Sequence, residues 1–444
     1  MSPRELTEGM SVSRTERPTA PATVRRIAFI ATRLAGTDGV TLETRKWATV
    51  LGKLGYECLL VAGELEAHTG RTHRIKEAAF THPDVAKIQR ECFGRSTRSR
   101  GLSKRIDESL LRIKGQIYRC QDKLKPDLWI AENCLAIPMH VPLGLALTEF
   151  LAETGLPCIA HHHDFVWERE RFASSAVSDY LHAAFPPKLP SIKHVVINSV
   201  AESQLSYRLG ISSTLIPNVM DFEQRPPKPS PRTKTFRRDI GVRDDDWLIL
   251  QPTRVVPRKQ IEHAVELVRR LNDPRARLVI THSTGDEGDE YARYIKNFAR
   301  MLGVPVKFIH KQMRPEWPAS PARRRKTFYE IADAYACADL VTYPSGYEGF
   351  GNAFLEAIYY RRPIVCNRYS IYQTDIEPKG FKAITMDGFV REDTVLEARR
   401  ALEDQRYRRE MVEHNYQLSR QFFSYSVLKS KLHALLTEFA GVRR

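Results

Sequence analysis

The chain has 444 residues, of which 42% are hydrophobic and 27% are charged. This ordinary balance excludes a collagen-like repeat, a coiled coil and wholesale disorder, and the length predicts two or three domains. The 69 lysines and arginines exceed the 53 acidic residues and give a formal net charge of +16.

Residues 1–22 are rich in proline, threonine and charge, which predicts a mobile tail without the apolar stretch of a secretory signal. The apolar segment 129–147 is interrupted by polar residues and prolines, namely Glu132, Asn133, Pro138, His140 and Pro142, so it is a poor membrane span. The seven cysteines include no C-x-x-C pair, so neither a disulfide framework nor a cysteine zinc site is expected. We expect a cytoplasmic protein, and peripheral contact with an anionic membrane stays open.

The first half of the chain alternates short apolar runs with segments of helical length. The run RIAFIAT from Arg26 precedes a helical pattern over 42–54 and a second strand-like run, YECLLVA. Further strand-like runs cover 127–131, 156–161 and 193–199. Such alternation predicts a parallel sheet covered by helices on both faces.

Prolines and basic residues then cluster in RPPKPSPRTK, which cannot sustain a helix or a central strand. The alternation restarts after it, with strand-like runs at 247–253, 277–282, 306–310, 339–343 and 363–366, and helical patterns at 259–271, 289–302, 325–337 and 352–361. The predicted units are an N-terminal domain over 23–224, a linker over 225–234, a second domain over 235–420 and a C-terminal helix over 421–444. Packing of this last helix against the first domain stays open. Two open α/β domains normally hold a ligand in the cleft between them.

The most informative stretch is YPSGYEGFGNAFLEAIYYRRPIVC, in which a strand ends at Tyr343 and a helix begins near Asn352. Glycines in the intervening loop let backbone amides approach a ligand, and the positive end of the helix favours an anion such as phosphate. Glu348 in the loop and Glu356 on the helix can each accept hydrogen bonds from neighbouring sugar hydroxyls. A plain helix entry would explain the glycines as well.

This segment resembles the E-x7-E signature of family 4 retaining glycosyltransferases, which have the GT-B architecture: two Rossmann-like domains whose parallel sheets face a central cleft. The resemblance covers the chain from about residue 25 onward. It implies that Glu348 faces the hexose of a nucleotide-sugar donor and that Glu356 holds the ribose hydroxyls. It also implies that the backbone near Phe350, Gly351 and Asn352 contacts hexose and phosphate.

The segment TRVVPRKQ, after the first strand of the second domain, resembles the R-x4-K element of the same family. In that element Arg254 and Lys259 would bind the donor diphosphate. Fixed cations stabilise the charge that develops on a leaving nucleoside diphosphate. Two solvated surface cations are the alternative, but cations at a helix N-terminus are disfavoured unless an anion sits there.

The loop LAGTDGVTLE follows the first strand, where this family carries a glycine-rich loop near the diphosphate and acceptor. The resemblance assigns Gly39 to the diphosphate, and Asp38 is a candidate for an acceptor hydroxyl. A plain turn explains the loop about as well.

The segment AHHHDFVWERERF ends a strand of the first domain. Because adjacent strand residues point to opposite faces, only His161 and His163 can share a side, and we expect no metal site. The resemblance places His163 at the donor sugar, with His162 in reserve, and puts a nearby backbone carbonyl close to the anomeric carbon.

Candidates for an acceptor pocket are the residues around and after these histidines: His162, Asp164, Trp167 and Arg169. The aromatic side chains of the segment are equally compatible with an ordinary core.

Two further strings bear on the resemblance. IPNVMDF resembles the family's junction between the domains, with Val219 in place of a glycine, and NRYSIYQTDIEP replaces the family's G-G-x-P-E element. The second difference predicts a pocket particular to a subfamily. Together with HHHDF it resembles transferases that make glucosylglycerate-type solutes.

Basic residues crowd 90–105, which we expect to be a loop of the first domain, and again 323–326. A phosphorylated acceptor, an anionic membrane or nucleic acid would each suit such a run, and a solvated surface explains it as well.

The resulting prediction is a retaining glycosyltransferase that moves a hexose from a nucleotide-diphosphate sugar to a hydroxyl of an acceptor alcohol or sugar, small and polar or anionic. No cofactor or metal is required, because the cations and the helix N-terminus serve the charge role. No nucleic-acid partner is expected. The alternatives are a nucleotide-sugar epimerase or a phosphorylase on the same scaffold, and a basic protein that binds polyanions.

Overall fold

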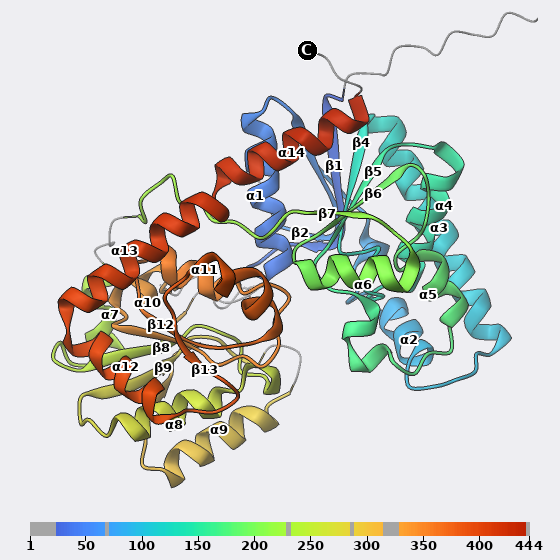
Figure 1. The fold of residues 1–444 in the computed structure, drawn as a ribbon. Coiled ribbons are helices and arrows are strands. Elements are labelled where there is room, and N and C mark those ends of the chain that lie inside the picture. Colours follow the sequence, from blue (N-terminus) through green and yellow to red (C-terminus); the bar gives the residue numbers. More distant parts are fainter. Residues whose placement is uncertain (1–23, 67–70, 228–231, 285–287, 314–327, 441–444) are drawn as a thin grey trace, which may run out of the picture.

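The computed structural model describes residues 24–440 apart from 67–70, 228–231, 285–287 and 314–327. Within these residues the chain forms two α/β domains, each built on a parallel sheet (Figure 1). The predicted pair of parallel-sheet domains is confirmed. The predicted tail over 1–22 and the basic run over 323–326 lie outside the described residues.

The first sheet has the order β3-β2-β1-β4-β5-β6-β7, and its pairings are parallel. Its strands are β1 (Arg26–Leu34), β2 (Glu57–Leu65), β3 (Arg71–Arg74), β4 (Leu128–Glu132), β5 (Cys158–His162), β6 (Ile192–Val196) and β7 (Ser213–Leu215). Its helices are α1 (Gly39–Lys53), α2 (Pro83–Cys92), α3 (Arg100–Leu124), α4 (Val141–Thr154), α5 (Ser178–Ala184) and α6 (Ser199–Leu209), with 3-10 turns η1 (Lys76–Ala78), η2 (Val166–Glu168) and η3 (Glu170–Phe172).

The alternation of side chains along β1 divides the core of this domain into two layers. Ile27 and Phe29 pack with α1 and α14, whereas Ala28 and Ile30 pack with α3 and α4. Because successive side chains of a strand point to opposite faces, an uninterrupted apolar strand is what a sheet covered on both sides requires.

The second sheet has the order β10-β9-β8-β11-β12-β13, again parallel. Its strands are β8 (Trp247–Gln251), β9 (Ala276–Ile280), β10 (Val306–Phe308), β11 (Leu340–Tyr343), β12 (Ile364–Asn367) and β13 (Ile384–Met386). The helices of this half are α7 (Thr233–Asp239), α8 (Ile261–Leu271), α9 (Glu290–Met301), α10 (Ile331–Cys337), α11 (Asn352–Tyr359), α12 (Glu392–Glu403), α13 (Gln405–Phe422) and α14 (Tyr425–Ala440), with short turns η4 (Pro257–Lys259), η6 (Tyr372–Ile376) and η7 (Glu377–Lys379).

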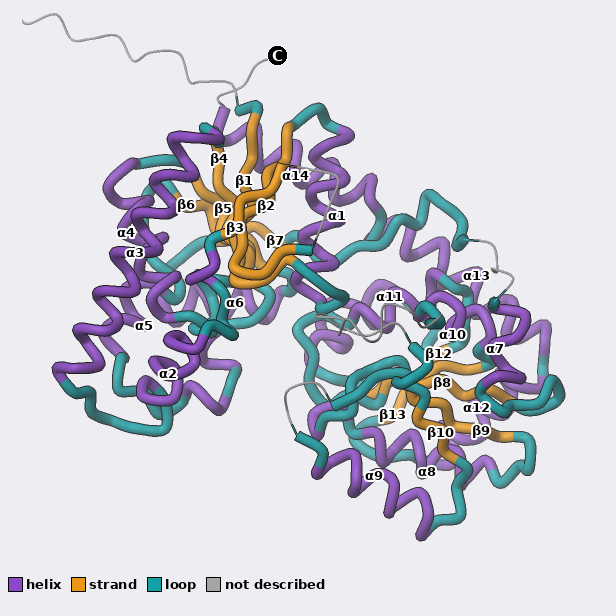
Figure 2. Tube along the Cα trace, turned by 180° about the vertical axis from the view of Figure 1, so that it is seen from behind, coloured by secondary structure: helices purple, strands orange, loops and turns teal. Residues whose placement is uncertain are grey.

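The chain passes between the domains at two neighbouring places. Val219 belongs to the core of the first domain and Phe222 to that of the second, so the first crossing takes three residues and lies upstream of the proline-rich run. The second crossing leads from α13 to α14, and the Met220 amide donates to the Phe423 carbonyl at 2.9 Å. Helix α14 then lies along α1 on the first domain (Figure 1), where Leu428 packs in the same core layer as Phe29. Figure 2 gives the view from behind, with the two sheets in orange.

The expectation of a loop over 90–105 is correct only for residues 93–99, and it is wrong for the two helices on either side. Residues up to Cys92 belong to α2, and α3 begins at Arg100. Leu102, Ile106, Leu110 and Ile113 recur at helical spacing and are buried, and the Ser99 side chain caps the helix by accepting from the Leu102 amide at 3.1 Å. The basic residues occupy the other face, which is why their density conceals the helix.

Candidate active site

The glycine-rich loop between β11 and α11 touches the first domain. A Cβ atom on Gly349 would lie 2.9 Å from the backbone oxygen of His163, and the Asn198 side chain donates to the Gly349 carbonyl at 2.6 Å. Gly351 has φ of 124°, a conformation that side chains rarely allow. The loop therefore needs glycine for close approach at Gly349 and for backbone conformation at Gly351.

Glu348 lies in this loop with its carboxylate buried between two cations of the second domain. It accepts from Lys259, at the end of η4, and from Arg258 Nη1 at 3.1 Å. Burial alone would raise the pKa of Glu348, but these two cations outweigh it and lower the pKa to about 2. Burial lowers the pKa of Lys259, against the opposing charge of Glu348.

Arg254 belongs to the same group of cations. Its charge contributes to lowering the pKa of Lys259 and that of His282, which burial brings down to about 4. The sequence predicted Arg254 and Lys259 here but missed Arg258, although the adjacent basic residues in PRK were a visible signal. Two cations thus bind one carboxylate at the carboxyl end of the second sheet, and the charge of Arg254 acts on Lys259 from nearby, which leaves a net positive charge that an anionic ligand would satisfy.

Glu356 lies one helical turn inside α11. Its carboxylate accepts from the Tyr335 hydroxyl at 2.8 Å, and burial raises its pKa above the ordinary value. The charges of Lys46 and Lys259 act on it from the two domains. The structure therefore places Glu356 within electrostatic reach of Lys259, and its contact with a donor ribose stays a prediction.

The residues at the start of α11 are engaged in contacts of their own. Phe350 is 2% exposed, and its carbonyl accepts from the Tyr369 hydroxyl at 2.7 Å. The Asn352 side chain accepts from Asn218 Nδ2 at 2.8 Å, and its own Nδ2 atom would lie 3.4 Å from a Cβ atom on Gly39. The start of α11 thus meets the first domain beside the loop after β1.

On the first domain, a buried carboxylate that the sequence analysis missed organises the histidines. Glu132 ends β4 and is 2% exposed. Its Oε2 atom lies 3.0 Å from His161 Nδ1 and 3.3 Å from His163 Nε2. The only signal in the sequence is a charged residue closing the apolar run DLWIAE.

The predicted alternation of the three histidines is confirmed. The rings of His161 and His163 lie 4.4 Å apart, and Trp47 stacks on His161 at 4.1 Å. His162 points the other way and lies 2.9 Å from His194 on β6, buried in the sheet. The structure therefore brings His163 to the inter-domain contact and leaves His162 in the interior.

The turn after β5 is held by Asn133, a residue with φ of 58°. Its side-chain oxygen accepts from the amide of His163 at 3.0 Å, and its amide group donates to Asp164 at 2.9 Å. Asp164 also pairs with Arg169, whose Nε donates at 2.9 Å. Tyr347 of the glycine-rich loop reaches this turn and hydrogen-bonds Glu168.

Two predicted acceptor residues have structural partners elsewhere. Asp38 caps α1, accepting from the Thr41 amide at 3.1 Å, and pairs with Arg33 at 3.4 Å. Trp167 stacks on Phe165 at 4.5 Å and donates to Gln204 of α6 at 2.6 Å. Asp38 stays beside the loop after β1, whereas Trp167 packs against α6.

Among the described residues, Glu132, His161 and His163 are the group whose chemistry suits a metal ion, with ligand atoms within 4.8 Å of one another. Their atoms already form hydrogen bonds to one another. The prediction that no metal is required stays a prediction.

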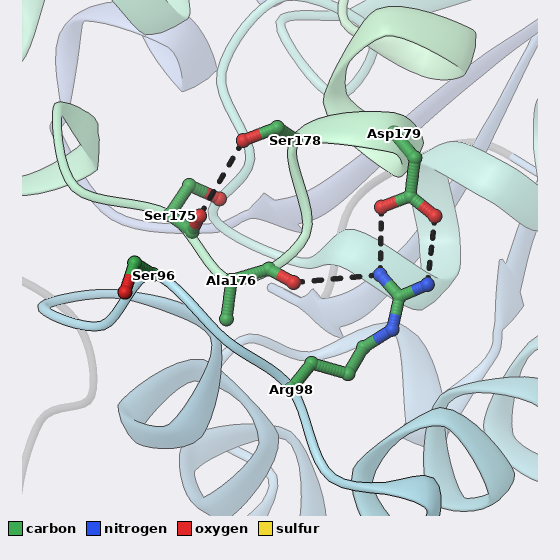
Figure 3. A pocket seen from close by; sticks show the side chains of 6 residues that line it. All are labelled: Ser96, Arg98, Ser175, Ala176, Ser178 and Asp179. Atoms are coloured by element: carbon green, nitrogen blue, oxygen red, sulfur yellow. Dashed lines mark hydrogen bonds and ion pairs between the residues drawn. The ribbon is translucent and has the colours of Figure 1, made fainter.

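The basic run over 90–105 is partly neutralised by its own neighbours. Arg98 forms a two-pronged pair with Asp179 at 2.6 and 2.7 Å, and Arg105 pairs with Glu91 at 2.5 Å. Figure 3 shows Arg98 and Asp179 in a pocket that also includes Ser96, Ser175 and Ser178. This arrangement fastens the loop before α3 to the start of α5.

Comparison with known proteins identifies the family to which the chain is similar. Residues 232–418 match the family described as "Glycosyl transferases group 1". The chain is 30% identical over 443 residues to the mannosylglucosylglycerate synthase of Thermotoga maritima, covering 92% of this chain and 98% of that protein.

Solved structures share its architecture at low identity. The sucrose-phosphate synthase of Thermosynechococcus elongatus is 15% identical with a TM-score of 0.66, covering 93% of this chain and 98% of that one. The Anabaena protein HepE in complex with UDP-glucose is 14% identical with a TM-score of 0.62, covering 93% and 99%. The predicted GT-B architecture is confirmed.

No described helix is both long enough and apolar enough to span a membrane. Family membership favours the predicted transferase over the epimerase, the phosphorylase and the polyanion-binding protein. The chain belongs to the group 1 glycosyltransferases.

Proposed function

We propose that this glycosyltransferase moves a hexose, with retention of anomeric configuration, from a nucleotide-diphosphate sugar to a hydroxyl of a small polar acceptor that carries a carboxylate. The group formed by Arg254, Arg258, Lys259 and Glu348 is the observation that carries the proposal. Two cations on one buried carboxylate, with the charge of Arg254 acting on one of them, beside a helix N-terminus, suit a diphosphate. HepE, a structural neighbour, was solved with UDP-glucose.

The donor would lie between the two domains. Arg254 and Lys259 would bind its diphosphate, and the backbone at Phe350, Gly351 and Asn352 would contact phosphate and hexose. Glu348 would accept from hexose hydroxyls and Glu356 from the ribose. His163 would contact the hexose, because its carbonyl lies against Gly349, which belongs to the same loop as Glu348.

In the reaction, the bond from the anomeric carbon to the phosphate oxygen breaks and a bond to the acceptor oxygen forms on the same face. The acceptor proton passes to the leaving phosphate oxygen. The cations stabilise the charge that develops on the diphosphate, so no further cofactor is needed for that role. Asp38, Asp164 and Arg169 are the proposed acceptor contacts.

The acceptor class is proposed from similarity to the Thermotoga protein, whose name specifies a sugar derivative of glycerate. A glycerate moiety carries one carboxylate and hydroxyls, which suits a protein of net charge +16 in which Lys46 of the first domain and Lys259 of the second both act on Glu356. We propose the cytoplasm as its compartment, because all seven cysteines are free thiols.

The test is a matrix of UDP-, GDP- and ADP-hexoses against glucosylglycerate and glucosylglycerol, which differ in the carboxylate. We expect a product only with a nucleotide sugar, faster turnover with glucosylglycerate, and the donor's anomeric configuration in the product by NMR. Donor binding should also raise the melting temperature. Donor epimerised or cleaved without an acceptor-dependent product, or an inverted anomer, would contradict the proposal.

A further inference from the structure

We propose that Glu132 is a positioning residue for catalysis: its buried carboxylate fixes the ring of His163 so that the other ring nitrogen is presented to the donor hexose. The inference rests on the proposed function, which places His163 at the donor. Nothing in the sequence resemblance points to Glu132.

The geometry of the strand ends carries the first step. Glu132 ends β4, and the parallel register pairs it with His161 on β5. Side chains two residues apart on a strand share a face, so His161 and His163 both reach the same carboxylate. One oxygen, Oε2, serves both rings at 3.0 and 3.3 Å.

The second step concerns which nitrogen of His163 remains for a ligand. An imidazole has two nitrogens, and a hydrogen bond to one fixes the role of the other. Because Nε2 donates to Glu132, Nδ1 is the atom left for a substrate oxygen. Burial alone would lower the pKa of His163, but the hydrogen bond and charge of Glu132 outweigh it and raise the pKa.

The third step is rigidity. The Trp47 ring stacks on His161, and the His161 ring lies against that of His163, so the His163 ring cannot turn freely. Asn133, next to Glu132, holds the His163 amide at 3.0 Å and thereby fixes the backbone whose carbonyl meets Gly349. The dipeptide of Glu132 and Asn133 thus fixes the ring and the backbone of one residue at the inter-domain contact.

The decisive experiment is a double-mutant cycle with Glu132→Gln and His163→Ala, assayed for kcat and donor KM. We expect Glu132→Gln to lower kcat roughly 10- to 100-fold while donor KM changes less than about threefold, because a misplaced ring loses contact mainly in the transition state. In the His163→Ala background the same change should cost less than about twofold, since Glu132 acts through His163.

Glu153→Gln is the matched control, the same chemical change at an exposed carboxylate on α4 that pairs with Lys114. It should leave kcat unchanged. Folding of each variant is checked by near-ultraviolet circular dichroism.

A second measurement does not depend on a variant that folds. In wild-type protein with 15N-labelled histidine, the His163 ring should show a protonated, hydrogen-bonded Nε2. A free, unprotonated Nε2 would overturn the proposal.

Three kinetic outcomes would also overturn it: a folded Glu132→Gln enzyme with wild-type kcat, an equal loss with and without His163, or wild-type activity abolished by a chelator and restored by Zn²⁺ or Mn²⁺ only while Glu132 is present. The last would show that the three side chains hold a metal. If the wild-type enzyme uses no nucleotide sugar, the proposed function fails instead, and the histidine spectrum still decides the contact.

Discussion

The two sides of the inter-domain contact use the same device with different chemistry. On each side one buried carboxylate serves two nitrogen groups: Glu348 binds Lys259 and Arg258, and Glu132 binds His161 and His163. Both carboxylates have a pKa lowered to about 2 by those partners, against the effect of burial.

The difference lies in the partners. Lysine and arginine stay charged at every physiological pH, so the donor side has a constant electrostatic field. Imidazoles exchange protons near neutrality and have two distinct nitrogens, so the other side has its charge and its geometry set by hydrogen bonds. The first arrangement suits neutralisation of a diphosphate, and the second suits orientation of a sugar.

The largest effect is expected on the donor side. Lys259→Met removes a cation from the diphosphate site, and turnover should fall roughly 100- to 1000-fold. It also strips a partner from a buried carboxylate, which should cost about 3 kcal/mol of unfolding free energy. Adding Glu348→Gln should restore much of the stability, measured by urea unfolding, without restoring turnover. A Lys259→Met enzyme with wild-type turnover would contradict the assignment of Lys259 to the donor diphosphate.

Next in size is the contact that joins the two sides. Gly349→Ala would place a methyl group 2.9 Å from the His163 carbonyl, so the loop must move away from the first domain. We expect turnover to fall about tenfold or more through lost alignment. Gly115→Ala, in the middle of α3 with no atom within 4 Å of the new Cβ, is the control and should stabilise the protein by about 0.5 to 1 kcal/mol. Equal turnover in the two variants would contradict the close contact.

A change of pH should report on two buried histidines of the first domain, His140 and His194. Burial lowers the pKa of His140 and of His194 to about 4, from an ordinary value of 6.5. Below pH 6.5 the unfolded chain therefore binds more protons than the folded one, and unfolding free energy should fall as pH drops from 6.5 to 4. The pKa of Glu348 is lowered from 4.5 to about 2, so its carboxylate adds to this loss of stability only below about pH 5, where the unfolded chain begins to bind that proton. His194→Gln should flatten the profile of urea midpoints; an unchanged slope would show that His194 does not titrate this way.

The smallest effect is expected at the pocket of Figure 3. Asp179→Asn breaks a pair in which the aspartate side chain is 57% exposed, so the loss should be under about 1 kcal/mol and turnover should not change. A marked rise in acceptor KM would instead assign this pocket to the acceptor.

Much of the fold followed from the sequence because its signals are local. Continuous apolar runs such as WLILQ report strands buried on both faces, and the spacing of Glu348 and Glu356 reports a loop and one turn of helix. Strands β3, β7 and β13 escaped notice because three or four residues are too few to carry a periodic signal. Helix α3 was missed where basic residues masked its apolar stripe.

The sequence by itself determined which residue types could neutralise a diphosphate and that His161 and His163 share a face, since both depend on spacing within one segment. Only the tertiary structure decided that Glu132 hydrogen-bonds both histidine rings, that Arg258 joins Lys259 at Glu348, and that Gly349 meets the His163 carbonyl. These contacts join residues far apart in the chain. Strand order and domain packing set them, and no pattern within one segment encodes either.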